Sequence, residues 1–67
     1  MALRTKVLEY LERSPSDLFT LQKDLDLRLD RLANELSNLL DAGYITKAND
    51  LFYLSDRGRE YLRAERP

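Results

Sequence analysis

A helix ends and a strand begins within Leu36-Ser37-Asn38-Leu39-Leu40-Asp41-Ala42-Gly43-Tyr44-Ile45. Before Gly43 the Leu residues recur at helical spacing, which indicates that they share one buried face. Glycine readily takes the left-handed backbone conformation with which many helices end. The aromatic and β-branched residues that follow favour a strand. These residues therefore predict a helix that stops at Ala42 and leads directly into a sheet.

Upstream of this stretch, residues 16–42 contain neither Gly nor Pro, and their Leu residues recur at helical spacing. A single helix of that length would extend about 40 Å. A compact chain of 67 residues has a radius of gyration of only about 11 Å. We therefore expect two helices, over residues 21–26 after a Thr20 N-cap and over residues 29–42, with a turn near Leu27-Arg28.

Downstream of Gly43, two short segments are rich in aromatic and β-branched residues, which predicts an antiparallel hairpin. The expected strands are residues 44–47 and 51–54, and residues 48–50 have the composition of a turn. Because side chains alternate along a strand, we expect one face to be buried and the other to carry Thr46 and Tyr53. The residues expected to face inward are Ile45, Phe52 and Leu54.

Both ends of the chain favour helix. Apolar residues at helical spacing predict a first helix over residues 2–13, which Ser14-Pro15 should end. Ser55 is placed to act as the N-cap of a last helix. The predicted fold is mainly α with a small β-hairpin (α+β), in the order helix, helix, helix, hairpin, helix, and residues 1–67 are expected to form one domain.

The composition excludes most catalytic chemistry. The chain has no Cys and no His, so disulfides, thiolate metal sites and imidazole catalysis are not available to it. We expect no enzyme activity, no metal site and no cofactor. The carboxylate pairs Asp24/Asp26 and Asp30/Glu35 lack the loop spacing of a cation site. No apolar run is long enough to span a membrane, and a cytoplasmic location is expected.

Two motifs resemble the winged helix-turn-helix family. Residues 36–45, with two Leu three positions apart before Gly43, look like the end of a recognition helix and the entry to a wing. Residues 52–62, which read Phe-Tyr-Leu-Ser-Asp-Arg-Gly-Arg-Glu-Tyr-Leu, resemble the close of the same domain in MarR-type and PadR-type regulators. Gly58 would let the last helix pack tightly on the hairpin. The resemblance covers residues 2–65 and implies a winged-helix fold.

The resemblance also implies a function, namely sequence-specific binding of double-stranded DNA by a small homodimeric transcriptional regulator. The exposed face of the third helix would be Asp30, Arg31, Asn34, Glu35 and Asn38. From that face Arg31, Asn34 and Asn38 would read base edges, since Arg pairs with guanine and Asn with adenine. The basic side chains expected near phosphates are Lys23, Arg28, Lys47 and Arg57.

The charge distribution favours a second hypothesis. The chain has 11 basic and 12 acidic residues, whereas a nucleic-acid-binding domain usually carries a basic patch. Residues 14–42 have three basic residues against six acidic ones, and the segments on either side each have a net charge of +1. The alternative is a winged-helix module that binds a protein partner and not DNA, through the acidic helix face and the surplus Leu residues.

The apolar residues exceed what a small core requires. Leu18, Leu27 and Leu29 are expected to form an exposed patch, and dimerisation through the first or last helix is its expected use. Among the aromatic residues, Tyr53 could contact a partner. The others are expected to pack in the core or at its rim, namely Tyr10, Phe19, Tyr44, Phe52 and Tyr61.

Overall fold

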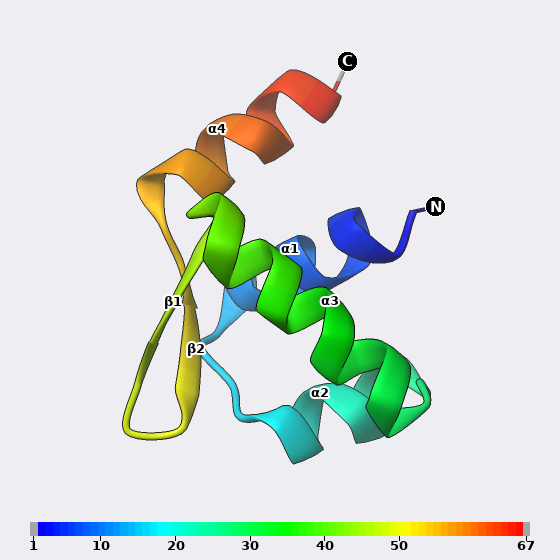
Figure 1. Cartoon of the computed structure of the whole chain (residues 1–67). Helices are drawn as coiled ribbons and strands as arrows, with labels where there is room; N and C mark the ends of the chain where they lie inside the picture. Colours follow the sequence, from blue (N-terminus) through cyan, green and yellow to red (C-terminus); the bar gives the residue numbers. More distant parts are fainter. Residues whose placement is uncertain (1, 67) are drawn as a thin grey trace.

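The computed structural model describes residues 2–66, which form four helices and a two-stranded antiparallel hairpin. Their order confirms the predicted α+β class (Figure 1). The elements are α1 (Leu3–Arg13), α2 (Leu18–Leu25), α3 (Leu29–Ala42), β1 (Ile45–Ala48), β2 (Leu51–Leu54) and α4 (Asp56–Glu65). None of the helices within residues 2–66 has the length and apolar content needed to cross a membrane.

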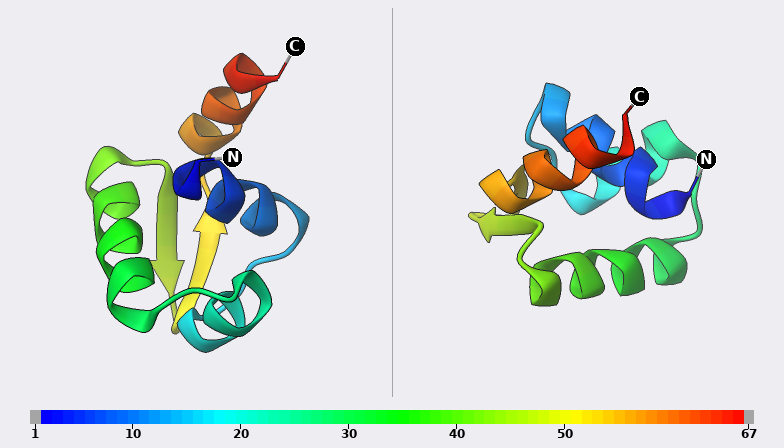
Figure 2. Two further views of the ribbon diagram at one scale, coloured as in Figure 1. Left: turned by 90° about the vertical axis from the view of Figure 1, so that its right-hand side faces the viewer. Right: turned by 90° about the horizontal axis from the view of Figure 1, so that it is seen from above.

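The core lies where α1 meets the inner faces of α3 and the hairpin. It consists of Val7, Leu8, Leu11, Leu21, Leu32, Leu36, Leu39, Ile45, Phe52, Leu54 and Leu62. Seen from above, α3 runs along one side of the molecule, and no other element within residues 2–66 covers its outer face (Figure 2). This placement leaves a whole helix face available to a partner.

The predicted break between the second and third helices is confirmed. Asp26 takes a left-handed conformation with φ 54° and ψ 55°, and its backbone N–H donates to the Gln22 carbonyl. Asp is among the residues that tolerate this conformation best, so the chain turns here without glycine. The radius of gyration of 10.8 Å agrees with a compact chain and not with a long rod.

The start of α2 differs from the prediction. Asp17, not Thr20, is the N-cap, and its carboxylate accepts from the Thr20 backbone N–H at 2.8 Å. Thr20 therefore lies inside the helix, which begins at Leu18. Both residue types cap helices, and carboxylates are additionally favoured by the positive end of the helix dipole.

The hairpin turns through Asn49 and Asp50, both of which have positive φ. Two such residues in a two-residue loop are characteristic of the turn that matches strand twist. Pairing joins Ile45 to Leu54 and Thr46 to Tyr53. As predicted, Ile45, Phe52 and Leu54 are buried, and Thr46 and Tyr53 are exposed. The first strand begins at Ile45 and not at Tyr44.

The sequence did not predict a contact that widens the sheet. Ser16 pairs with Phe52 in an isolated antiparallel bridge. The two residues exchange backbone hydrogen bonds, with N···O distances of 3.2 and 2.8 Å. The loop between α1 and α2 thus adds a single residue to the free edge of β2.

The prediction for Phe19 was wrong, because its side chain is 68% exposed. On α2 the buried residue is Leu21, and Phe19 lies about 200° from it around the helix axis. The other four aromatic residues expected to pack are buried or half-buried. Of the three surplus Leu residues, Leu18 and Leu27 are half-buried and only Leu29 is exposed, at 41%.

Candidate nucleic-acid interface

The outer face of α3 carries the three predicted base-reading side chains. Arg31, Asn34 and Asn38 are all exposed. Within residues 2–66, none of these side chains makes a hydrogen bond or an ion pair. Their polar groups are therefore available to an external partner.

The same face also carries acidic residues. At about 100° per residue, Asp30, Asn34, Ser37 and Asp41 form one line along the side of α3 opposite its buried Leu residues. All four are exposed. The carboxylates thus lie near the two ends of α3, and the middle of the line is polar without charge. Arg31 and Asn38 lie together on one side of this line, about 80–100° from Asp30 around the helix axis.

Glu35 does not belong to the exposed face, contrary to the prediction. Its carboxylate lies 3.1 Å from the Arg4 guanidinium of α1, and its side chain is only 16% exposed. Glu35 lies about 100° from Asn34 around the helix, on the side toward α1. The ion pair neutralises one of the six acidic residues within residues 14–42.

Arg4 is held in place by an aromatic cluster. Its guanidinium carbon lies 5.8 Å from the centre of the Tyr44 ring, and that of Arg57 lies 5.5 Å from the same ring. Tyr44 in turn packs against Tyr61 of α4 at a centroid distance of 5.0 Å. Cations lie favourably over such rings. The cluster therefore fixes Arg4 beside α3 and connects α1, the residue before β1 and α4.

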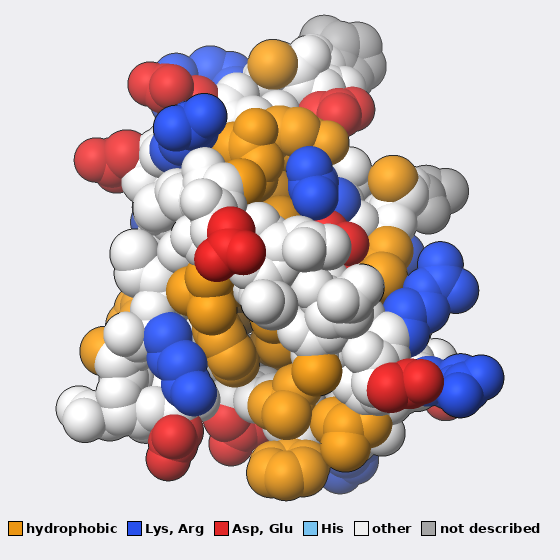
Figure 3. Space-filling model, viewed as in Figure 1, with side chains coloured by type: hydrophobic (Ala, Val, Ile, Leu, Met, Phe, Trp, Pro, Cys, Tyr) orange, Lys and Arg blue, Asp and Glu red, His pale blue; other side chains and the backbone are white. Residues whose placement is uncertain are grey.

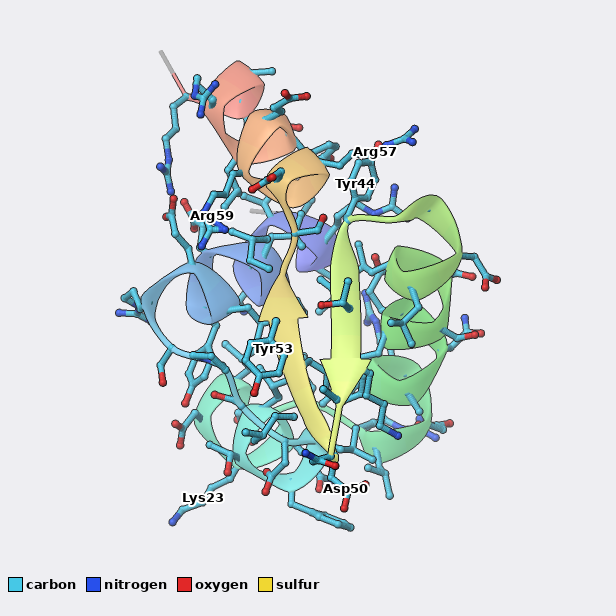
Figure 4. The ribbon with its side chains drawn as sticks, turned by 90° about the vertical axis from the view of Figure 1, so that its left-hand side faces the viewer. Lys23, Tyr44, Asp50, Tyr53, Arg57 and Arg59 are labelled. Atoms are coloured by element: carbon cyan, nitrogen blue, oxygen red, sulfur yellow. The ribbon has the colours of Figure 1, made fainter. Side chains whose placement is uncertain are left out.

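The four predicted phosphate contacts are dispersed. Lys23 and Arg57 lie at opposite ends of the molecule (Figure 4). Arg28, at the start of α3, pairs with Asp30 at 3.2 Å, but both side chains are largely exposed, so the pair contributes little and can open. Lys47 lies on β1 with its ammonium 5.6 Å from the centre of the Phe52 ring. Arg28 is the N-cap of α3, and the Arg57 side chain lies beside Gly43, the C-cap of the same helix.

In each of the two carboxylate pairs considered as cation sites, Asp24/Asp26 and Asp30/Glu35, a residue of α1 binds one of the two carboxylates. The Tyr10 hydroxyl donates to Asp24, and this hydrogen bond raises the pKa of Tyr10. In the second pair, the Glu35 carboxylate forms an ion pair with Arg4. Within residues 2–66, no three acidic side chains converge as metal ligands would.

A groove between the start of α2 and the hairpin was not predicted. It encloses about 400 Å³ and is lined by Asp17, Leu18, Phe19, Lys47, Asp50 and Phe52. Hydrophobic side chains gather at this lower end of the molecule, over α2 (Figure 3). The lining residues come from two segments that lie far apart in the sequence, so no local spacing signals the groove.

Comparison of the chain with protein-family models, with curated proteins and with solved structures found no match. The functional interpretation therefore depends on the geometry of this chain and on the two motifs in its sequence.

Proposed function

We propose that this protein is a small winged-helix regulator that binds double-stranded DNA with α3 as its recognition helix and the hairpin as its wing. The order of elements supports this proposal, because a helix pair with a sharp turn precedes a hairpin and a last helix. The bridge between Ser16 and Phe52 adds the beginning of a third strand. Fold alone does not assign a function, so the argument depends on the exposed side chains.

The observation that carries the proposal concerns Arg31, Asn34 and Asn38. Their side chains are exposed on the outer face of α3, and within residues 2–66 they make no hydrogen bond or ion pair. Their amide and guanidinium groups match the base edges of the major groove. Arg31 would donate to guanine, and Asn34 and Asn38 would bind adenine. Of the acidic residues beside this set, Glu35 is held by Arg4 and Asp30 pairs with Arg28.

Backbone contacts would come from the margins of the same face. Arg28 lies at the start of α3 and Lys47 on the hairpin, so they flank the base-reading residues along the chain. Phosphate contacts fix the register of a protein on the duplex and carry no sequence information. Lys23 and Arg57 would contribute at the periphery.

The active form in this proposal is a cytoplasmic homodimer. Two copies would place their recognition helices in successive turns of the major groove, which are about 34 Å apart. Dimerisation would also compensate for the few basic contacts that one subunit offers. A symmetric target sequence is the direct consequence.

Selection of bound duplexes from a random library, followed by titration of single variants, tests the assigned roles. Arg31→Ala should relax the sequence preference by roughly 1–3 kcal/mol at one base pair. Lys47→Ala should weaken binding to every duplex to a similar extent. Equal effects of the two variants on sequence preference would refute the assignment.

The second candidate is a module that binds a protein partner. The line of Asp30 and Asp41 on α3 and the exposed ring of Phe19 favour it. In that case Asp30→Asn and Asp41→Asn would weaken binding of the partner, because they remove charge from its docking face. In a DNA-binding protein the same two changes would strengthen binding of duplex, since they remove repulsion of phosphate.

A further inference from the structure

We infer that the groove between the start of α2 and the hairpin binds a small organic cation with an aromatic or aliphatic body. This ligand class follows from the floor of the groove, its size and the charges at its rim. The site is separate from α3, and its binding is measured without DNA.

The floor of the groove is apolar and partly open. Leu18, Phe19 and Phe52 contribute to it, and the Phe19 ring is 68% exposed. The exposed Phe19 ring therefore offers apolar surface to a ligand beside the Leu18 and Phe52 side chains. The volume of about 400 Å³ is within the range of pockets for small ligands.

The charges at the rim favour a cation. Asp17 and Asp50 line the groove together with Lys47. Hydrogen bonds from Thr20 lower the pKa of Asp17, so its carboxylate is ionised at neutral pH. The Lys47 ammonium already lies over the Phe52 ring, which leaves the exposed Phe19 ring available for a second cation. The rim carries two carboxylates and one ammonium, and the positive end of the α2 dipole offsets part of the Asp17 charge.

Two substitutions remove the rim charges while they preserve the local backbone. Asp17 is the N-cap of α2, and Asn caps helices as well as Asp does. Asp50 has a φ of 69°, and Asn tolerates positive φ as well as Asp does. Asp17→Asn and Asp50→Asn therefore separate the charge of the groove from its fold. Asp26→Asn is the matched control, since Asp26 at the far end of α2 is exposed, has positive φ like Asp50 and does not line the groove.

The experiment titrates three probes of similar shape into ¹⁵N-labelled protein and follows the amide shifts by NMR at constant ionic strength. The probes are 2-phenylethylammonium, neutral 2-phenylethanol and anionic 3-phenylpropionate. We expect the cation to bind tightest and to shift the amides of the groove. Each Asn variant should weaken cation binding roughly 1.5- to 5-fold, as expected for one exposed ion pair, and should leave 2-phenylethanol unaffected.

Phe19→Ala should weaken all three probes, because it removes the apolar part of the site, and Asp26→Asn should change none. Equal affinities for the three probes would overturn the proposal, since the groove would then be a nonselective apolar contact. Preference for 3-phenylpropionate would also overturn it and assign the site to anions through Lys47. Unchanged cation binding in the Asp17→Asn/Asp50→Asn double variant would have the same consequence.

Discussion

The guanidinium of Arg4 lies 3.1 Å from the carboxylate of Glu35, so that α1 neutralises an acidic residue on α3. Glu35 is four positions after Arg31, and residues at this spacing are neighbours on a helix surface. Without Arg4, Glu35 could pair with Arg31 and occupy the guanidinium that the proposed function assigns to guanine. The ion pair between α1 and α3 thus keeps Arg31 available.

Arg4→Gln is therefore expected to weaken DNA binding by more than the loss of one distant charge. The double variant Arg4→Gln/Glu35→Gln should restore most of the affinity, because it removes the competing carboxylate. Fluorescence anisotropy with a selected duplex measures both effects. Lys6→Gln is the matched control, since it removes the same charge from the same helix. If Arg4→Gln and Lys6→Gln weaken binding equally, the Arg4–Glu35 pair has no role in keeping Arg31 available.

Gly58→Ala should destabilise the fold. A Cβ atom at Gly58 would lie 2.2 Å from the Tyr44 backbone carbonyl and 2.5 Å from Leu54 Cδ1, so α4 would have to move away from the hairpin. The expected loss in the free energy of unfolding is roughly 1–3 kcal/mol, typical of overpacking. Urea denaturation measures it.

Gly43→Ala provides a contrast. Space is available there, with the nearest atom 3.7 Å away, but φ is +80° and a side chain makes that conformation costly. A loss of about 1 kcal/mol is expected. Urea denaturation of Gly43→Ala measures this loss. In the same measurement, an unchanged stability of Gly58→Ala would contradict the close packing of α4 on the hairpin.

Ser55→Ala should also lower stability, because its hydroxyl connects two helix ends. Ser55 Oγ accepts from the Gly58 N–H at 3.1 Å and donates to the Gly43 carbonyl at 2.6 Å. Loss of a Ser N-cap typically costs about 1 kcal/mol. Ser37→Ala, at an exposed position on α3, should be close to neutral when both variants are compared by urea denaturation. A neutral Ser55→Ala would show that the cap contributes nothing to folding.

The contact between the ends of α1 and α4 should depend on pH. The Arg66 guanidinium donates to the Glu12 carboxylate and thereby lowers the pKa of Glu12 below its ordinary value of 4.5. The contribution of this ion pair to stability is therefore fully present above pH 4.5, the pKa of Glu12 in the unfolded chain. It is lost as pH falls through the lower pKa that Glu12 has in the folded protein. Arg66→Gln should have a lower Tm than the wild type at pH 7, and the difference should diminish in acid. A difference that is constant from pH 7 to pH 3 would contradict this linkage.

Local chemistry explains why most of the fold could be predicted. Gly43 ends α3 in the expected left-handed conformation, and Ser55 caps α4 as expected. In both cases the signal is contained within a few residues. At the start of α2, both Asp17 and Thr20 are residue types that cap helices. The sequence does not show that Ser16 pairs with Phe52 of the sheet, so that the helix begins directly after Asp17. Because the helix was expected to begin after Thr20, the exposed position of Phe19 on the first turn of α2 was not predicted.

The candidate site could be predicted only in part. The exposure of Arg31, Asn34 and Asn38 follows from the helical spacing of the buried Leu residues. The pairing of Glu35 with Arg4 does not, because the two residues are 31 positions apart. Nothing in their local sequence distinguishes this pair from other combinations of opposite charge. The groove beside Phe19 could not be predicted for the same reason, because it forms between two segments that are distant in the sequence, the start of α2 and the hairpin.

Titration of a selected duplex over a range of salt concentrations tests the central claim most directly. With about three basic contacts per subunit, a bound dimer should show a slope of log affinity against log salt of roughly −5. Binding should be measurable at about 20 mM salt and much weaker at about 150 mM, where surface charges are screened. Absence of binding to any duplex at about 20 mM salt would contradict the assignment of α3 as a DNA-reading helix.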